Sequence, residues 1–343
     1  MGTLRLGSRI ALLLSLSLLT CVPRSRAQNS TDDVHIVPRT SPEGTKVPEL
    51  SLPPQDDDPA LRHLRPLRFD VDLVQVPVTV TDAKNRPVMG LKQHNFTVYE
   101  DEQRQDVQFF SDEDAPISVG LILDLSKSMS NKIVTEREAV EQFFNNANPQ
   151  DDYFVVTFSD RPRLLANSTQ SIEDIQQKLA TVVPDGQTAL LDAVYLAVAK
   201  MHKARHRRRA LLIVSDGGDN HSRYGLKEIK SLVQEADVQV YAIGIFDSLL
   251  PFRSFEEFMG KRWLGEITDA TGGRTISADS IGKVPEIAAN ISREMRNQYV
   301  LGYKPDKDAA NGRWRKIRVH VNPPEGTTRV QAYYKKGYLA AKK

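Results

Sequence analysis

Cysteine is almost absent from this sequence, which contains only one, Cys21, in 343 residues. Because Cys21 lies in an N-terminal segment that we expect to be removed, the mature chain would contain none. Disulfides, thiolate zinc sites, iron–sulfur clusters and a cysteine nucleophile are therefore excluded. An excess of one charge is lacking as well, since 46 Lys and Arg are balanced by 44 Asp and Glu. This balance argues against nucleic acid as a partner.

Known catalytic motifs and long hydrophobic runs are also missing. The sequence has no G-x-S-x-G elbow, P-loop, G-x-G-x-x-G turn or H-E-x-x-H helix, so we do not expect an enzyme. The apolar run 10–19 is shorter than the roughly 20 residues of a transmembrane helix. We therefore expect no transmembrane span in the mature chain.

The N-terminus has the pattern of an export signal. Arginines precede the apolar run, and Ser25-Arg26-Ala27 places small residues before a cleavage point after Ala27. We predict a signal peptide over residues 1–27 and a periplasmic, cell-surface or secreted protein. The alternative is a lipoprotein attached through Cys21, which Thr20 disfavours because the residue before a lipidated cysteine is usually smaller.

Short strands with frequent turns flank the centre of the chain. A proline-rich stretch over 28–67 is predicted to be a disordered linker. Apolar residues then alternate with polar ones in 68–113 and again in 299–340. The first of these segments is too small to close a β-sandwich alone, so we predict that the two pair into one small sandwich, with the central region inserted between them. Pro77 favours an edge strand or a bulge.

Residues 116–298 alternate between apolar runs and amphipathic segments. Runs such as 117–123 and 210–214 are apolar almost throughout, which is typical of strands buried on both faces of a parallel sheet. Helical periodicity is found over 132–147, 172–182, 188–203, 225–236, 254–270 and 282–297. This region is predicted to be a doubly wound, Rossmann-like α/β domain with a mostly parallel sheet. A ligand site is expected at the carboxyl ends of its central strands.

Oxygen-bearing side chains are found where two of these strands end. Asp124, Ser126 and Ser128 occupy every second position after the first strand, and Asp216 follows another. Thr188 precedes a long helical segment. Carboxylates and hydroxyls are hard oxygen ligands, which suit Mg²⁺, Mn²⁺ or Ca²⁺ and are wrong for zinc or copper. We predict that these five residues form a metal site, with one coordination position left for water or an incoming carboxylate.

The pattern D-x-S-x-S, followed by T and then by D, resembles the metal-ion-dependent adhesion site of the von Willebrand factor type A family. The resemblance extends over roughly 116–298. Three flanking pieces, 71–80, 96–100 and 296–303, look like those of the VWFA-related proteins of Acidobacteria. In the family the three loop residues and the threonine bind the metal, and the last aspartate usually holds it through water.

The resemblance implies adhesion or protein–protein interaction in which an Asp or Glu of the partner completes the metal coordination. Two alternatives stay open: an interaction scaffold with a purely structural metal, and a metal-dependent hydrolase. Lys127 departs from the family, which often has glycine there, although the alternation directs this side chain away from the ligands. Thr188 could instead only cap its helix. Asp219 and Asn220 lie close enough in the sequence to support the ligands, but a solvated loop is their expected position.

Overall fold

The computed structural model describes residues 73–246, 255–305, 312–324 and 329–340. The predicted signal peptide, 1–27, and the predicted linker, 28–67, lie outside these ranges. Arg68–Lys343 form one compact unit. Within the described residues, no helix combines the length and the apolar character that crossing a membrane requires.

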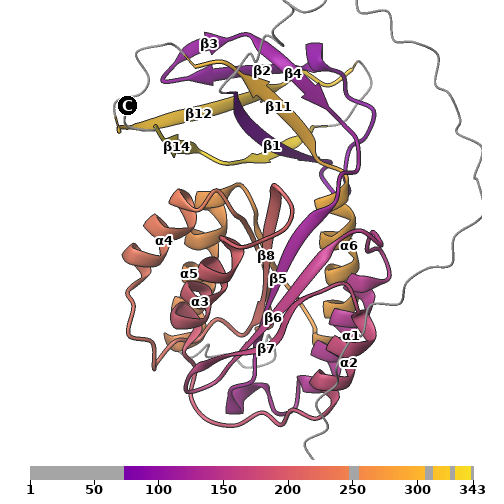
Figure 1. Ribbon diagram of the computed structural model, residues 1–343, viewed down its shortest axis with the longest axis vertical. Helices are drawn as coiled ribbons and strands as arrows, with labels where there is room; N and C mark the ends of the chain where they lie inside the picture. Colours follow the sequence, from indigo (N-terminus) through magenta and orange to yellow (C-terminus); the bar gives the residue numbers. More distant parts are fainter. Residues whose placement is uncertain (1–72, 247–254, 306–311, 325–328, 341–343) are drawn as a thin grey trace, which may run out of the picture. The chain divides into compact units, whose positions relative to one another are not determined.

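A mostly parallel sheet forms the centre of the α/β domain (Figure 1). Its strands are Ile117–Asp124 (β5), Asp152–Phe158 (β6), Pro162–Thr169 (β7), Arg208–Ser215 (β8), Gln239–Gly244 (β9) and Thr275–Ser277 (β10). They follow the order β10-β9-β8-β5-β6-β7, and all neighbours are parallel except β6 and β7. Every residue of β5 is buried, as expected for a central strand covered on both faces.

Helices cover both faces of this sheet (Figure 1). They are Ile133–Phe144 (α1), Ile172–Ala180 (α2), Leu190–Met201 (α3), Leu226–Glu235 (α4), Phe255–Thr271 (α5) and Val284–Arg296 (α6). Apolar side chains of α1, α2 and α6 share one core with one face of the sheet, and those of α3, α4 and α5 share a second core with the other face. The predicted doubly wound α/β fold is confirmed.

Two antiparallel sheets form the β-sandwich. Their strands are Val74–Thr81 (β1), Phe96–Glu100 (β2), Gln103–Gln105 (β3), Val107–Ser111 (β4), Tyr299–Tyr303 (β11), Trp314–Val321 (β12), Gln331–Tyr334 (β13) and Gly337–Leu339 (β14). The orders are β13-β1-β11-β4 and β14-β12-β2-β3, so each sheet combines strands from before and after the α/β domain. The predicted pairing of the two flanking segments is therefore confirmed.

Pro77 does not mark an edge strand, contrary to our expectation. It lies in β1, which has β13 on one side and β11 on the other. The two pairings are staggered, however: β11 pairs with Val74 to Val78 of β1, whereas β13 pairs only from Val78 onward. At Pro77 the strand therefore has a neighbour on one side only, which a residue without a backbone N–H tolerates.

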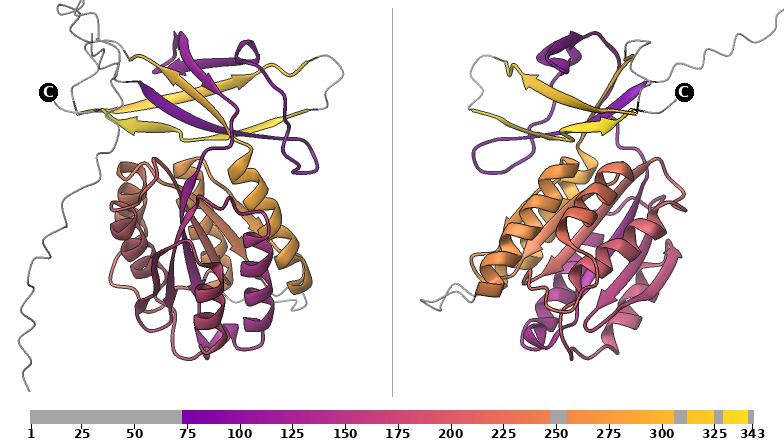
Figure 2. Two further views of the ribbon diagram at one scale, coloured as in Figure 1. Left: turned by 45° about the vertical axis from the view of Figure 1, so that its right-hand side comes forward. Right: turned by 90° about the vertical axis from the view of Figure 1, so that its left-hand side faces the viewer.

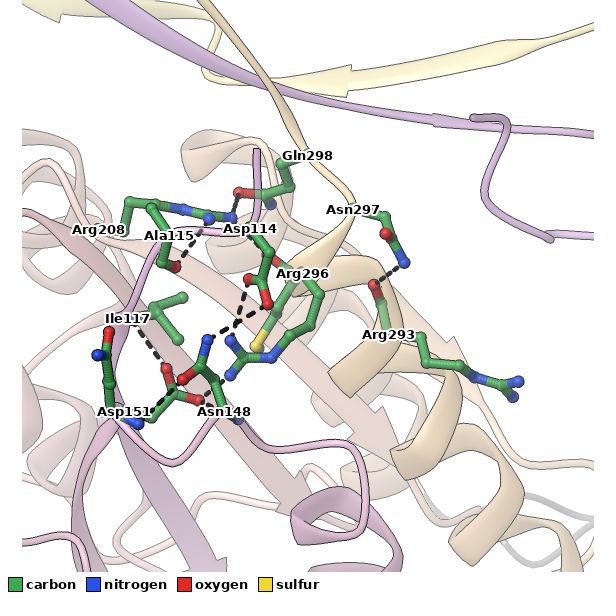
Figure 3. A network of polar contacts seen from close by, with 12 residues as sticks. Asp114, Ala115, Ile117, Asn148, Asp151, Arg208, Arg293, Arg296, Asn297 and Gln298 are labelled. Carbon is green, nitrogen blue, oxygen red and sulfur yellow. Dashed lines mark hydrogen bonds and ion pairs between the residues drawn. The ribbon is translucent and has the colours of Figure 1, made fainter. Parts of the chain in front are cut away.

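The chain passes between the α/β domain and the sandwich at two neighbouring places, before β5 and after α6 (Figure 2). Arg296, at the end of α6, forms ion pairs with Asp114 and with the fully buried Asp151 (Figure 3). Asp151 also accepts hydrogen bonds from the backbone N–H of Ile117, at 3.0 Å, and from the hydroxyl of Tyr153, at 2.8 Å. One buried carboxylate thus holds the two crossings together.

Arg208, the first residue of β8, adds a second link between the crossings. Its guanidinium donates to the carbonyl oxygen of Ala115, at 3.0 Å, and to that of Met295, at 2.6 Å (Figure 3). Gln298, which follows α6, donates from its amide to the hydroxyl of Tyr241 in β9, at 2.9 Å. The amino ends of the parallel strands are therefore tied to both segments that lead into the sandwich.

Asp151→Asn should destabilise the protein, because it leaves the guanidinium of Arg296, whose side chain is 11% exposed, without its buried carboxylate. Breaking a buried ion pair on one side lowers the free energy of unfolding by about 3 kcal/mol or more. Urea denaturation followed by circular dichroism measures the difference.

Asp174→Asn is the matched control. Asp174 pairs with Lys178 on the surface of α2, where the two side chains are 44% and 43% exposed. Exposed ion pairs contribute less than about 1 kcal/mol, so this variant should unfold nearly as the wild type does. Equal losses in the two variants would contradict the role given to Asp151.

Candidate metal-binding site

Asp124 ends the central strand β5, and its side chain is fully buried. One carboxylate oxygen accepts a hydrogen bond from the backbone N–H of Ser126, at 2.9 Å. The other accepts from the hydroxyl of Ser215, at 2.5 Å. Ser215 is the last residue of β8, the parallel neighbour of β5. The carboxylate of Asp124 therefore lies where the two central strands end, as predicted from the sequence.

The two predicted serine ligands follow in the loop after β5. The hydroxyl oxygens of Ser126 and Ser128 are 3.0 Å apart, so they lie on the same side of the loop, as expected. Ser126 is buried, whereas Ser128 is exposed. The side chain of Lys127 between them is also exposed, in agreement with the expected outward direction.

Asp216 directly follows Ser215 and is 8% exposed. Its negative charge acts on Asp124: burial, and then the charge of Asp216, raise the pKa of the Asp124 carboxyl to about 7. The hydrogen bonds from Ser126 and Ser215 oppose this shift. The structure therefore brings together the two acids of the predicted site at the ends of adjacent strands.

Thr188 lies in a loop that is hydrogen-bonded to the loop after β5. The N–H of Asp185 donates to the carbonyl of Leu125, at 2.9 Å, and the N–H of Lys127 donates to the carbonyl of Gly186, at 3.1 Å. Thr188 itself is 6% exposed. It is not the N-cap of its helix, because α3 begins at Leu190 and Ala189 occupies the capping position. The capping alternative is therefore wrong, and direct metal contact by Thr188 stays a prediction.

Asp219 and Asn220 lie in the loop after β8, where Asp219 is half-buried and Asn220 is exposed, as expected, and both also form hydrogen bonds with the segment around Thr188. The side-chain oxygen of Asn220 accepts from the N–H of Thr188, at 3.0 Å, and a carboxylate oxygen of Asp219 accepts from the N–H of Leu191, at 2.8 Å. The backbone N–H of Asn220 donates in turn to the carbonyl of Thr188, at 3.0 Å. These bonds fix the backbone of Thr188 against the segment that follows Asp216.

Two charged residues near the site were missed by the sequence reasoning. Lys132, just before α1, places its ammonium 3.6 Å from a carboxylate oxygen of Asp216. Glu136, on α1, is 1% exposed, and neither carboxylate oxygen has a hydrogen-bond partner. Burial, and then the charge of Asp124, raise the pKa of the Glu136 carboxyl. Glu136 could have been found because it occupies the apolar stripe of the helix, together with Ala139, Val140 and Phe143.

The donor chemistry of the predicted set fits a hard divalent cation. No cluster of three or more His, Cys, Asp or Glu that could hold a metal ion is found within the described ranges. The predicted set contains two acids only, and its other three members are hydroxyl groups. Carboxylate and hydroxyl oxygens are ligands for Mg²⁺, Mn²⁺ or Ca²⁺, so the residues present are compatible with such an ion.

Residues 119–218 match the sequence profile of the von Willebrand factor type A domain. The matched range contains all five candidate ligands, from Asp124 to Asp216. No curated protein matches the chain.

Several solved structures resemble the fold at low identity. BatB from Bacteroides thetaiotaomicron is 16% identical over 52% of this chain and 98% of its own, with a TM-score of 0.42. A von Willebrand factor type A protein from Catenulispora acidiphila is 11% identical over 80% and 75%, with a TM-score of 0.48. Proximal thread matrix protein 1 from the mussel byssus, in a form with zinc in its MIDAS motif, is 20% identical over 57% and 49%, with a TM-score of 0.44. At these identities no binding property is transferred from them to this chain.

Gly217→Ala should destabilise the site, because Gly217 has a positive φ of 81° and a Cβ there would lie 2.8 Å from the carbonyl carbon of Gly260. A left-handed backbone pressed against another backbone costs about 1–3 kcal/mol when a side chain is added. The strain falls next to Asp216. Urea denaturation of the purified variant measures the loss.

Gly265→Ala is the control for this substitution. Gly265 lies within α5, and a Cβ added there would have no atom within 4 Å. Alanine is favoured over glycine in a helix by up to about 1 kcal/mol, so this variant should be as stable as the wild type or more stable. Unchanged stability in Gly217→Ala would contradict the close backbone approach.

Proposed function

We propose that the von Willebrand factor type A domain of this chain, to which residues 119–218 belong, mediates protein–protein interaction that depends on a divalent cation. The ligands of Mg²⁺, or of Mn²⁺ or Ca²⁺, would be Asp124, Ser126, Ser128, Thr188 and Asp216. A bound ion supplies a Lewis-acid centre, and an Asp or Glu carboxylate of the partner protein would complete its coordination.

The observation that carries this proposal is the burial of two carboxylates at neighbouring strand ends. Asp124 is 0% exposed and Asp216 is 8% exposed, and Ser215 connects their strands. Burying two acids side by side is unfavourable unless positive charge compensates them. The hydroxyl ligands are neutral, so the ion would keep enough positive charge to attract an external carboxylate, unlike the ion in a calcium site built from more acids.

The predicted signal peptide, 1–27, would take the protein out of the cytoplasm. We assign no catalytic activity, because Ser126 and Ser128 would serve as metal ligands and not as nucleophiles. The flanking segments of the sandwich support a closer relation to the VWFA-related proteins of Acidobacteria.

Asp124→Asn should abolish the binding of both cation and partner, because it removes one of two carboxylates while preserving the shape of a fully buried side chain. Titration calorimetry with Mn²⁺ measures the first effect. We expect at least about a 100-fold loss, which is the upper range for residues that only support a metal ligand. A pull-down from the native extracytoplasmic fraction, with and without EDTA, measures the second.

Glu138→Gln is the matched control, because Glu138 is an exposed acid on α1. It should bind cation and partner as the wild type does. Partner capture that persists in excess EDTA would count against the proposal. If Ser126→Ala lowers the melting temperature and leaves partner capture intact, the metal is purely structural and the partner binds elsewhere.

A further inference from the structure

Lys132 places a positive charge beside the predicted ligands. Its ammonium lies 3.6 Å from Oδ2 of Asp216 and 3.5 Å from the carbonyl oxygen of Ile245, which follows β9. Its side chain is only 12% exposed, and that of Asp216 is 11% exposed. Lys127, five residues earlier in the same segment, is exposed. A positive charge of the protein itself is therefore built into this end of the sheet.

We propose that Lys132 sets the cation affinity of the site: its ammonium compensates the buried carboxylates when no divalent ion is bound and weakens the binding of such an ion. The second half of this statement rests on the proposed function. The first half rests on the ion pair with Asp216 alone. Lys132 is thus a positioning and specificity-determining residue, distinct from the five predicted ligands.

The charges explain why this arrangement favours a carboxylate from outside. Asp124 and Asp216 bring two negative charges, and a divalent ion alone would neutralise them. With the ammonium of Lys132 close to Asp216, the filled site keeps one more positive charge than it would without the lysine. An incoming Asp or Glu of the partner neutralises that charge, because opposite charges attract strongly where water is largely excluded. Lys132 therefore lowers affinity for the ion and raises affinity for the partner's acid.

Lys132 also holds the side chain of Asp216 in place. The contact with the carbonyl of Ile245 fixes the ammonium between the loops that follow β8 and β9, and the ion pair orients one oxygen of Asp216. A replacement that keeps the charge should therefore preserve the wild-type affinity, whereas one that removes it should not. Glu136 is present in all the variants compared below, so its effect on the Mn²⁺ affinity is the same in each and cancels in the comparison.

The test is titration calorimetry of Mn²⁺ into the full chain, without any partner. Lys132→Met should bind Mn²⁺ at least about tenfold more tightly than the wild type, because the substitution removes a positive charge beside Asp216, a predicted ligand, where water is largely excluded. Lys132→Arg should bind like the wild type. Lys127→Met, which removes an exposed lysine from the same segment, should stay within about twofold, as exposed charges are screened.

Two further measurements, the melting temperature and the binding of acetate, distinguish a loss of charge at position 132 from a loss of folding. Without Mn²⁺, Lys132→Met should melt at a lower temperature than the wild type, and Mn²⁺ should restore the loss. Acetate added to the Mn²⁺-loaded proteins is the carboxylate probe, and its binding, measured by water proton relaxation of Mn²⁺, should be weaker in Lys132→Met. If Lys132→Met does not fold, Lys132→Gln repeats the titration with the same expected result.

The outcomes distinguish this inference from the proposed function. Equal Mn²⁺ affinity in the wild type and Lys132→Met overturns the inference and leaves the function standing. Equal tightening in Lys127→Met also overturns it, since the effect would then be general. If Lys132→Met binds Mn²⁺ and the wild type does not, the inference is supported. The lysine then takes the place of the ion in the wild-type protein, and this result overturns the metal-dependent function. Absence of binding in every variant overturns both.

Discussion

The buried carboxylate of Asp124 is the constraint on which the loops of the site depend. A carboxylate at 0% exposure needs donors, and it obtains them from the backbone of Ser126 and from the hydroxyl of Ser215. The first bond links the end of β5 to the loop that follows it. The second fixes the end of β8, where Ser215 also accepts from the N–H of Gly217 at 2.9 Å. The positions of Ser126 and Asp216 follow from satisfying one acid.

The parallel sheet explains why these residues, far apart in the sequence, meet at one edge. Parallel neighbours such as β5 and β8 end on the same side, so the residues that follow them are close without any special local signal. The loop of Thr188 joins them through backbone hydrogen bonds at Asp185 and Gly186. The meeting of side chains from three loops is therefore a consequence of the topology, and the loops contribute only the identity of the predicted ligands.

Much of this arrangement could be predicted from the sequence, because it depends on patterns that are local. Continuous apolar runs gave the buried strands, helical periodicity gave the helices, and the residues after the strands gave the candidate ligands. Lys132 could not be predicted, since a lysine before an amphipathic helix usually points to solvent and its direction here is set by Asp216, 84 positions away. The same holds for Asn220, whose partner Thr188 is 32 positions away. The edge strand expected at Pro77 was wrong for a similar reason. The stagger between β11 and β13 along β1 depends on strands that are distant in the sequence, and the residues around Pro77 do not reveal it.

The amino and carboxyl ends of the central strands differ in the residues that they position. At the amino ends, Ile117 of β5 and Arg208 of β8 are paired in register and belong to the network that holds the two crossings into the sandwich. At the carboxyl ends lie the predicted ligands. A strand of the length of β5 spans about 23 Å, at about 3.3 Å per residue, so the predicted ligands lie a full strand length from the crossings. The buried carboxylate of Asp151 joins Arg296 to the start of β5 at the opposite end. Buried acids therefore organise both ends of the sheet: Asp151 joins the two crossings, and Asp124 fixes the loops of the predicted site.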